Sequence, residues 1–234
     1  MNPKIILALD GMDGLTADKT TRLLWDYVDG FKINHTLYGL ADYINVKDPD
    51  KELFVDFKLW DTSNTVRNVI KDVISHGATM TTVSTYNNPE VFKIISEYGR
   101  NDIKLFGVSS LTSWTTEEAS IINGTWLPPH QMTGQEIISD LWKNHLKRIS
   151  DCNFTGVICP VEEIEYIDQI DDKLLKVCPG ISPNKWLSNY TGQVKVSSMD
   201  NARKKGADYV VVGRSIINAE DPLKAIKVLS KGGK

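Results

Sequence analysis

Short apolar runs alternate with amphipathic segments along the whole chain. The first run covers residues 4–10 and is followed by a segment of helical period at 15–28. Further runs rich in β-branched and aromatic residues lie at 30–34, 52–58, 79–85, 103–110, 154–160, 174–180 and 207–215. Strand-like runs that alternate with helical segments are typical of βα units. The pattern therefore predicts eight strands with helices between them.

The segment after the third run shows the helical period clearly. Its aliphatic residues recur at i, i+3, i+4, i+7 and i+8, which is one face of a helix: Val66, Val69, Ile70, Val73 and Ile74. Gly77 follows, and glycine is common just beyond a helix end. We expect this helix to pack on the outside of a sheet.

The length of 234 residues suits one large α/β barrel or two small domains. No GxGxxG motif follows the first strand, which disfavours an open dinucleotide-binding sheet. No linker or low-complexity tract divides the chain. We therefore predict an α/β fold, a (β/α)₈ TIM barrel that forms a single domain over residues 1–234.

Composition places the chain among ordinary globular proteins, with 41% hydrophobic residues, 24% charged residues and a formal net charge of −3. No basic stripe indicates nucleic-acid binding. No apolar run approaches the roughly 20 residues needed to cross a bilayer, and no secretory leader pattern opens the chain. We expect a cytoplasmic enzyme that binds neither nucleic acid nor membrane.

Polar and special residues gather where the predicted strands end. They are Asp10, Lys32, Asn34, Asp56, Lys58, Ser84, Thr85, Ser109 to Ser113, Pro179, Gly180, Gly213 and Arg214. Loops also begin at strand ends, so each position alone has a simple structural explanation. In a (β/α)₈ barrel, however, these ends surround one mouth that holds the active site. The whole set therefore favours a functional site.

The third run contains the sequence VDFKLWD at residues 55–61, in which charges interrupt an apolar strand. Strand alternation puts Phe54, Asp56, Lys58 and Trp60 on one face, with Asp56 and Lys58 directed into the barrel. Buried charges are costly unless they are paired, so a structural ion pair would also explain this segment. Lys32 on the preceding strand and Asp61 in the next loop extend the set. We expect a chain of opposite charges formed by Lys32, Asp56, Lys58 and Asp61.

Several motifs occur in a fixed order: ALD at 8–10, FKIN at 31–34, DFKLWDTSNTV at 56–66, LTS at 111–113, PGI at 179–181 and VVVGRSI at 210–216. Together they resemble the orotidine 5′-phosphate decarboxylase family over nearly the whole chain. The DxKxxD motif also occurs in magnesium-dependent 3-keto-L-gulonate 6-phosphate decarboxylases and hexulose-6-phosphate synthases, which remain an alternative. Lys32 favours the orotidylate enzymes, because the sugar-phosphate relatives are expected to carry glutamate near this position. A nucleotide-binding protein without turnover is a third reading.

The resemblance implies a homodimer with shared active sites that decarboxylates orotidine 5′-phosphate to UMP in pyrimidine biosynthesis, without cofactor or metal. Lys58 would protonate C6 of the pyrimidine, and Asp56 would lie against the departing carboxylate. Asp61 would reach across the dimer interface and complete the network with Lys32.

The resemblance also implies a set of substrate-binding residues. Asp10 and Lys32 would hold ribose hydroxyls, Ser113 the pyrimidine edge, and Gln193 the phosphate. Thr65 of the partner subunit would help to position the nucleotide, and Pro179 belongs to the PGI motif at the mouth.

Gly213 and Arg214 have an independent argument for phosphate binding. They end the eighth strand just before the helical segment at 221–230, where (β/α)₈ barrels often bind phosphate. The guanidinium of Arg214 adds a fork of hydrogen-bond donors.

Two positions depart from the family pattern. Ser182 stands where an arginine on the phosphate is expected, and we hypothesise that Lys185 supplies the missing charge. Thr62 replaces an apolar residue expected to touch the base, which would weaken substrate affinity or alter the pyrimidine preference.

Overall fold

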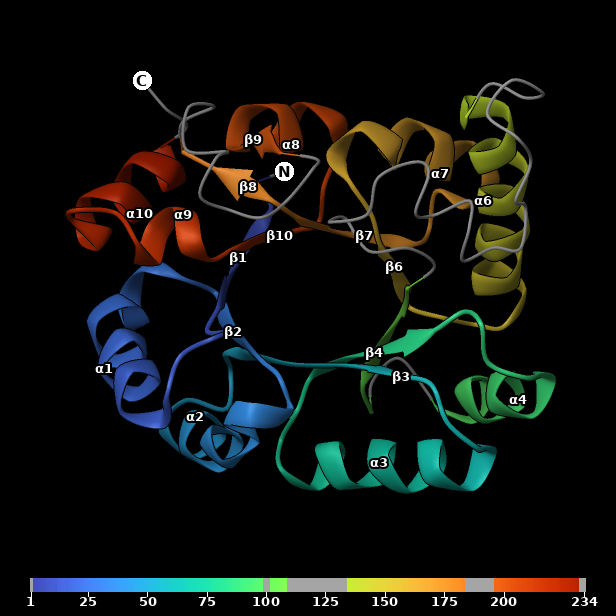
Figure 1. Ribbon diagram of the computed structural model, residues 1–234, viewed down its shortest axis with the longest axis horizontal. Helices are drawn as coiled ribbons and strands as arrows, with labels where there is room; N and C mark the ends of the chain where they lie inside the picture. Colours follow the sequence, from blue (N-terminus) through green and yellow to red (C-terminus); the bar gives the residue numbers. More distant parts are fainter. Residues whose placement is uncertain (1, 99–101, 109–133, 184–195, 232–234) are drawn as a thin grey trace.

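The computed structural model describes residues 2–98, 102–108, 134–183 and 196–231. Eight parallel strands close into a barrel in the order β1-β10-β7-β6-β5-β4-β3-β2 (Figure 1). These are β1 (Lys4–Ala8), β2 (Gly30–Ile33), β3 (Glu52–Leu59), β4 (Met80–Ser84), β5 (Lys104–Val108), β6 (Gly156–Ile158), β7 (Leu175–Pro179) and β10 (Tyr209–Val212). The predicted (β/α)₈ barrel is confirmed.

Helices surround the barrel as an outer ring (Figure 1). They are α1 (Gly14–Leu24), α2 (Ala41–Lys47), α3 (Ser63–Ser75), α4 (Pro89–Glu97), α6 (Gly134–Asp151), α7 (Ile164–Asp171), α8 (Met199–Lys205), α9 (Arg214–Ile217) and α10 (Pro222–Lys231). Short 3₁₀ helices are η1 (Trp25–Tyr27), η2 (His35–Leu40) and η3 (Val161–Glu163). A small parallel pair, β8 (Ile181–Ser182) and β9 (Ser197–Ser198), lies between β7 and α8 in the chain.

Helix α3 has the apolar face that the sequence predicts. Val66, Ile70 and Val73 are fully buried against the barrel, because residues three and four apart share one side of a helix. The chain leaves this helix through Gly77, whose φ of +77° lies in the left-handed region that glycine adopts readily.

The barrel separates two apolar layers. The larger layer packs between the strands and the helices, and Phe31, Leu53 and Val55 belong to it. A smaller cluster fills the barrel interior: Ile6, Ala8, Phe54, Met80, Phe106, Val177, Tyr209 and Val211. The interior is therefore a packed core, so the open end of the barrel is where a ligand can approach.

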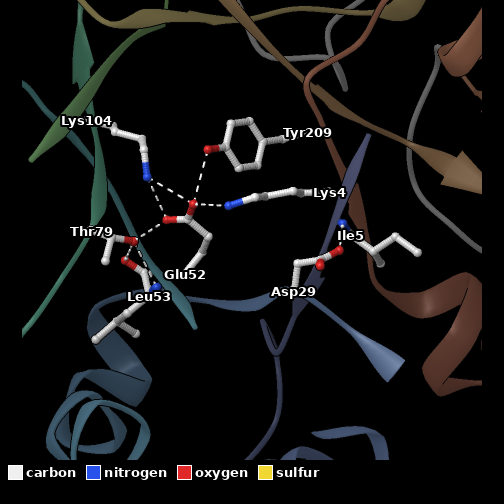
Figure 2. A network of polar contacts seen from close by, with 8 residues as sticks. All are labelled: Lys4, Ile5, Asp29, Glu52, Leu53, Thr79, Lys104 and Tyr209. Atoms are coloured by element: carbon white, nitrogen blue, oxygen red, sulfur yellow. Dashed lines mark hydrogen bonds and ion pairs between the residues drawn. The ribbon is translucent and has the colours of Figure 1, made fainter. Parts of the chain in front are cut away.

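The amino-terminal end of the barrel is closed by a polar network around Glu52 (Figure 2). Lys4 and Lys104 form ion pairs with its carboxylate at 2.9 and 2.8 Å. The hydroxyls of Thr79 and Tyr209 donate to the same carboxylate at 2.7 and 3.1 Å. Glu52 is only 5% exposed, and the two lysines compensate its buried charge.

Strand β3 is irregular near its carboxyl end. Val55 pairs with Thr81 and Leu59 pairs with Val83, so β3 carries extra residues where β4 does not. Within this bulge Lys58 has a φ of +48°, in the left-handed region that residues with a Cβ rarely adopt. The expected strict alternation therefore fails beyond Asp56, and Trp60 is 74% exposed instead of facing the barrel interior.

Candidate active site

The carboxyl ends of neighbouring strands bring the predicted charged residues together. Lys32 on β2 pairs in register with Ala8 of β1 and Phe54 of β3, both of which face the barrel interior. Strand β1 also pairs with β10, so Asp10 lies between the end of β10 and the end of β2. Residues distant in sequence thereby meet at one sector of the mouth.

Four side chains form a continuous chain of alternating charge. The Lys32 ammonium contacts the Asp10 carboxylate and lies 3.2 Å from Asp56 Oδ2. The Lys58 ammonium lies 2.7 Å from the same Oδ2 atom. Asp56 is thus shared by two lysines, and the order is Asp10, Lys32, Asp56, Lys58.

The inner members of this chain are buried and the outer members are accessible. The side chains of Lys32 and Asp56 are 9% and 12% exposed, whereas those of Lys58 and Asp10 are 42% and 41% exposed. Burial opposes ionisation of Asp56, but Lys32 and Lys58 outweigh it and lower the pKa of this carboxyl to about 2. Burial likewise opposes the charge on Lys32, yet Asp56 and Asp10 raise the pKa of its ammonium. The buried pair of Lys32 and Asp56 is therefore ionised at neutral pH.

This arrangement is suited to proton delivery next to a negative charge. A substrate carboxylate placed beside Asp56 would be destabilised by repulsion, because both groups are anionic in a partly buried site. The Lys58 ammonium is adjacent and accessible, so it can donate a proton to the atom that the carboxylate leaves.

Asp61 lies outside this chain in the described part of the protein. Its backbone N–H donates to Asn87 Oδ1 at 3.2 Å, and its carboxylate accepts the Thr62 N–H at 2.6 Å. The Thr62 N–H and then the Thr65 hydroxyl lower the pKa of this carboxyl. Among the described residues no lysine or arginine forms an ion pair with Asp61, so the predicted fourth member does not join the others within one subunit.

The strand ends on the other side of Asp10 are brought together as well. Arg214 is exposed and begins α9 directly after β10, so a short helix precedes the helical segment expected from the sequence. Ser215 Oγ donates to the Ile181 carbonyl at 3.1 Å, which ties this turn to the segment after β7. Pro179 ends β7, and Gly180, which follows it, has a φ of +77°.

Other predicted residues are placed as follows. Thr65 is exposed in the first turn of α3, and its hydroxyl lies 3.0 Å from that of Thr62. Ser182 is buried in β8. Ser113, Lys185 and Gln193 lie outside the described residues.

Two features of the site were missed by sequence reasoning. Asp10 was assigned only to substrate, yet it is also the first acid of the charge chain. Thr82 is not among the predicted site residues, although its hydroxyl contacts Asp56 Oδ1 at 2.8 Å. A signal was present for Thr82, because strand alternation places it on the same face as Met80, which fills the barrel interior.

Within the described ranges, no three histidine, cysteine or acidic residues gather in a way that could hold a metal ion. No described helix is both long enough and apolar enough to cross a membrane.

Comparisons with known proteins identify the family to which the chain is similar. A sequence model described as the orotidine 5′-phosphate decarboxylase / HUMPS family matches residues 3–229. An orotidine 5′-phosphate decarboxylase of Afipia carboxidovorans is 31% identical over 97% of this chain and 94% of its own length. One from Rhodopseudomonas palustris is 32% identical over 94% of this chain and 89% of its own length.

Solved structures show the same fold. An orotidine 5′-phosphate decarboxylase of Pyrococcus horikoshii aligns with a TM-score of 0.70 and 26% identity over 97% of both chains. One from Lactobacillus acidophilus aligns with a TM-score of 0.74 and 23% identity over 100% of both chains.

Proposed function

Because the chain belongs to the orotidine 5′-phosphate decarboxylase / HUMPS family, we propose that it converts orotidine 5′-phosphate to UMP and carbon dioxide. The observation that carries this proposal is the Lys32–Asp56–Lys58 contact chain, whose accessible end is an ammonium group. The curated relatives with 31% and 32% identity are named for this reaction. The expected role is the UMP-forming step of pyrimidine biosynthesis.

In the proposed reaction, the bond between C6 of the pyrimidine and the carboxylate carbon breaks and carbon dioxide leaves. The electron pair that stays on C6 takes a proton from the Lys58 ammonium, and the resulting amine regains a proton from water. Asp56 lies 2.7 Å from that ammonium and would face the departing carboxylate. Lys32 keeps Asp56 ionised, so the repulsion is present before the bond breaks.

The substrate would lie across the mouth from the charge chain to the end of β10. Asp10 and Lys32 would bind the ribose hydroxyls, because they lie between Lys58 and the end of β10. Gly213 and Arg214 would bind the phosphate, with a backbone N–H and a guanidinium suited to phosphate oxygens. Pro179 would border the nucleotide. We also propose that Ser113 binds the pyrimidine edge and that Gln193 binds the phosphate.

We further propose a homodimer in which each Asp61 enters the partner's site. Asp61 is exposed and has no cationic partner among the described residues of its own chain. Trp60 beside it is 74% exposed, and an accessible indole of this kind is typical of residues buried by association. Thr65 lies on the same surface and would position the nucleotide bound to the partner.

We also propose a cytoplasmic location. The substrate carries a phosphate and a carboxylate, and such an anion does not cross a bilayer unaided. The enzyme would therefore act in the compartment where the nucleotide is made.

The direct test is to incubate the purified protein with orotidine 5′-phosphate in EDTA. Decarboxylation is measured by the change in ultraviolet absorbance of the pyrimidine. We expect turnover in chelator, and we expect Lys58→Ala to lower kcat on the order of 10⁴-fold. Activity that disappears in EDTA and returns with magnesium would favour a sugar-phosphate enzyme. Tight UMP binding without turnover would indicate a nucleotide-binding protein.

The shared site has its own test. Lys58→Ala and Asp61→Asn subunits, each inactive alone, are mixed under conditions that exchange subunits. A mixed dimer then contains one site with an intact Lys58 and an intact Asp61, so about a quarter of wild-type activity should return. If mixing restores nothing although mass spectrometry shows mixed dimers, Asp61 does not act across the interface.

A further inference from the structure

One threonine hydroxyl on β4 contacts both Asp56 and Lys58. Thr82 is fully buried, and its Oγ1 lies 2.8 Å from Asp56 Oδ1. The same Oγ1 lies 2.8 Å from the backbone nitrogen of Lys58. An ionised carboxylate only accepts hydrogen bonds and a backbone N–H only donates, so the hydroxyl donates to Asp56 and accepts from Lys58. Both directions are thereby fixed.

The bulge in β3 explains why this contact is needed. Lys58 stands in left-handed backbone with a φ of +48°, which takes its N–H away from the regular strand ladder. A buried N–H without a partner is unfavourable, and the Thr82 hydroxyl accepts it in place of a β4 carbonyl. The side chain of Thr82 therefore helps to hold Lys58 in its rare conformation.

The contact also determines how Asp56 is oriented. Thr82 occupies Oδ1, which leaves Oδ2 for Lys32 at 3.2 Å and Lys58 at 2.7 Å. Without the hydroxyl, the carboxylate can rotate about its Cβ–Cγ bond and the Oδ2 atom no longer has one fixed place between the two ammonium groups.

We propose that Thr82 is a positioning residue, whose hydroxyl fixes the Asp56 carboxylate and the Lys58 backbone so that the ammonium is aimed for proton transfer. The inference rests on the decarboxylation proposed above. Thr82 acts through Asp56 and Lys58, so its loss should lower kcat much more than it changes KM.

The neighbouring Thr81 provides a matched control. It is also fully buried on β4, and its hydroxyl donates to the Val55 carbonyl of β3 at 2.7 Å. Its bond links the same two strands, but Val55 faces the outer apolar layer and not the charge chain. Thr81→Val thus removes a hydroxyl of the same type and burial without touching the site.

The experiment compares Thr82→Val, Thr82→Ser and Thr81→Val by kcat and KM for orotidine 5′-phosphate, with thermal unfolding measured for each. Thr82→Val keeps the shape and loses the hydroxyl, and we expect kcat to fall roughly 10- to 100-fold. Thr82→Ser keeps the hydroxyl and should restore kcat to within about threefold of wild type. Thr81→Val should lower the melting temperature and leave kcat unchanged.

A Thr82→Val enzyme with wild-type kcat, or a Thr81→Val enzyme that loses as much kcat, would overturn the inference. If Thr82→Val does not fold, Thr82→Cys replaces it, because a thiol is a weak hydrogen-bond donor of similar size and should give a smaller fall in kcat. An inactive wild type would overturn the proposed function and this inference with it. An active wild type with unaffected Thr82 variants would overturn only the inference.

Discussion

The two ends of strand β3 carry the same polar arrangement. At the amino-terminal end, Glu52 pairs with two lysines and accepts the hydroxyl of Thr79, which itself accepts the Leu53 N–H at 3.0 Å (Figure 2). At the other end, Asp56 pairs with two lysines and accepts the hydroxyl of Thr82, which accepts the Lys58 N–H. A buried carboxylate between lysines is therefore not by itself a sign of catalysis.

The difference lies in the backbone and in the end of the barrel at which each exposed lysine lies. Glu52 starts a regular stretch of β3 and receives a further hydrogen bond from Tyr209. Asp56 lies at a bulge next to a lysine in left-handed backbone, and that lysine is 42% exposed at the mouth. Lys4 of the first arrangement is 52% exposed at the amino-terminal end of the barrel, whereas Lys58 of the second is exposed at the mouth, where a substrate can bind.

The sharpest way to break this comparison is to neutralise each carboxylate in turn. We expect Asp56→Asn to lower kcat on the order of 10³-fold, because the repulsion and the partner of Lys58 are lost together. Glu52→Gln should leave kcat of the folded enzyme unchanged. Steady-state kinetics with orotidine 5′-phosphate measures both, and an equal loss of kcat in the two variants would show that the two ends do not differ in function.

Stability should respond in the opposite order. Glu52→Gln removes the buried countercharge of Lys4 and Lys104, and we expect the free energy of unfolding to fall by roughly 3 kcal/mol. Urea denaturation followed by tryptophan fluorescence gives this value. Glu165→Gln is the control, because it removes a carboxylate from the exposed ion pair with Lys205 and should change nothing measurable. A loss no larger than that of the control would contradict the structural role of Glu52.

The pH dependence of stability sharpens the same point. Burial opposes ionisation of Glu52, but hydrogen bonds from Lys104, Thr79 and Lys4 outweigh it and lower the pKa of this carboxyl from 4.5 to about 2. A depressed pKa in the folded state stabilises the protein above the unfolded value, and this contribution is lost as the pH falls. The free-energy difference between wild type and Glu52→Gln should therefore be constant above about pH 5 and shrink toward about pH 2. Urea titrations across this range test it, and a difference independent of pH would exclude the charge as its source.

The smallest expected effect concerns the backbone of Lys58. Its φ of +48° is unfavourable for residues with a Cβ, so Lys58→Gly should be more stable than Lys58→Ala by about 1 kcal/mol. Both variants lack the ammonium and should be equally inactive. Their difference in stability therefore reports the backbone strain and not the lost charge. Elsewhere in β3 glycine should be the less stable of the two, and Phe54→Gly against Phe54→Ala checks this.

Much of the fold was predictable because periodicity reports which faces are buried. The apolar spacing of α3 and the eight strand-like runs correspond to observed elements. The tendency of polar residues to follow strands also located Asp10, Lys32 and Asp56 at one mouth. The bulge at Lys58 was not predictable, because strict alternation assumes a regular ladder, and nothing local in VDFKLWD marks where β3 and β4 lose register.

The sequence by itself determined the barrel, the sector of the mouth and the residue types of the charge chain, since these follow from hydrophobic period and from the order of the strands. The tertiary structure alone decided that Asp56 is shared by two lysines, that Thr82 holds both Asp56 and Lys58, and that Asp61 lies apart from them. These contacts depend on the closure of the barrel and on a local shift in strand register. Both bring together atoms far apart in the chain, and no local pattern encodes the distances between them.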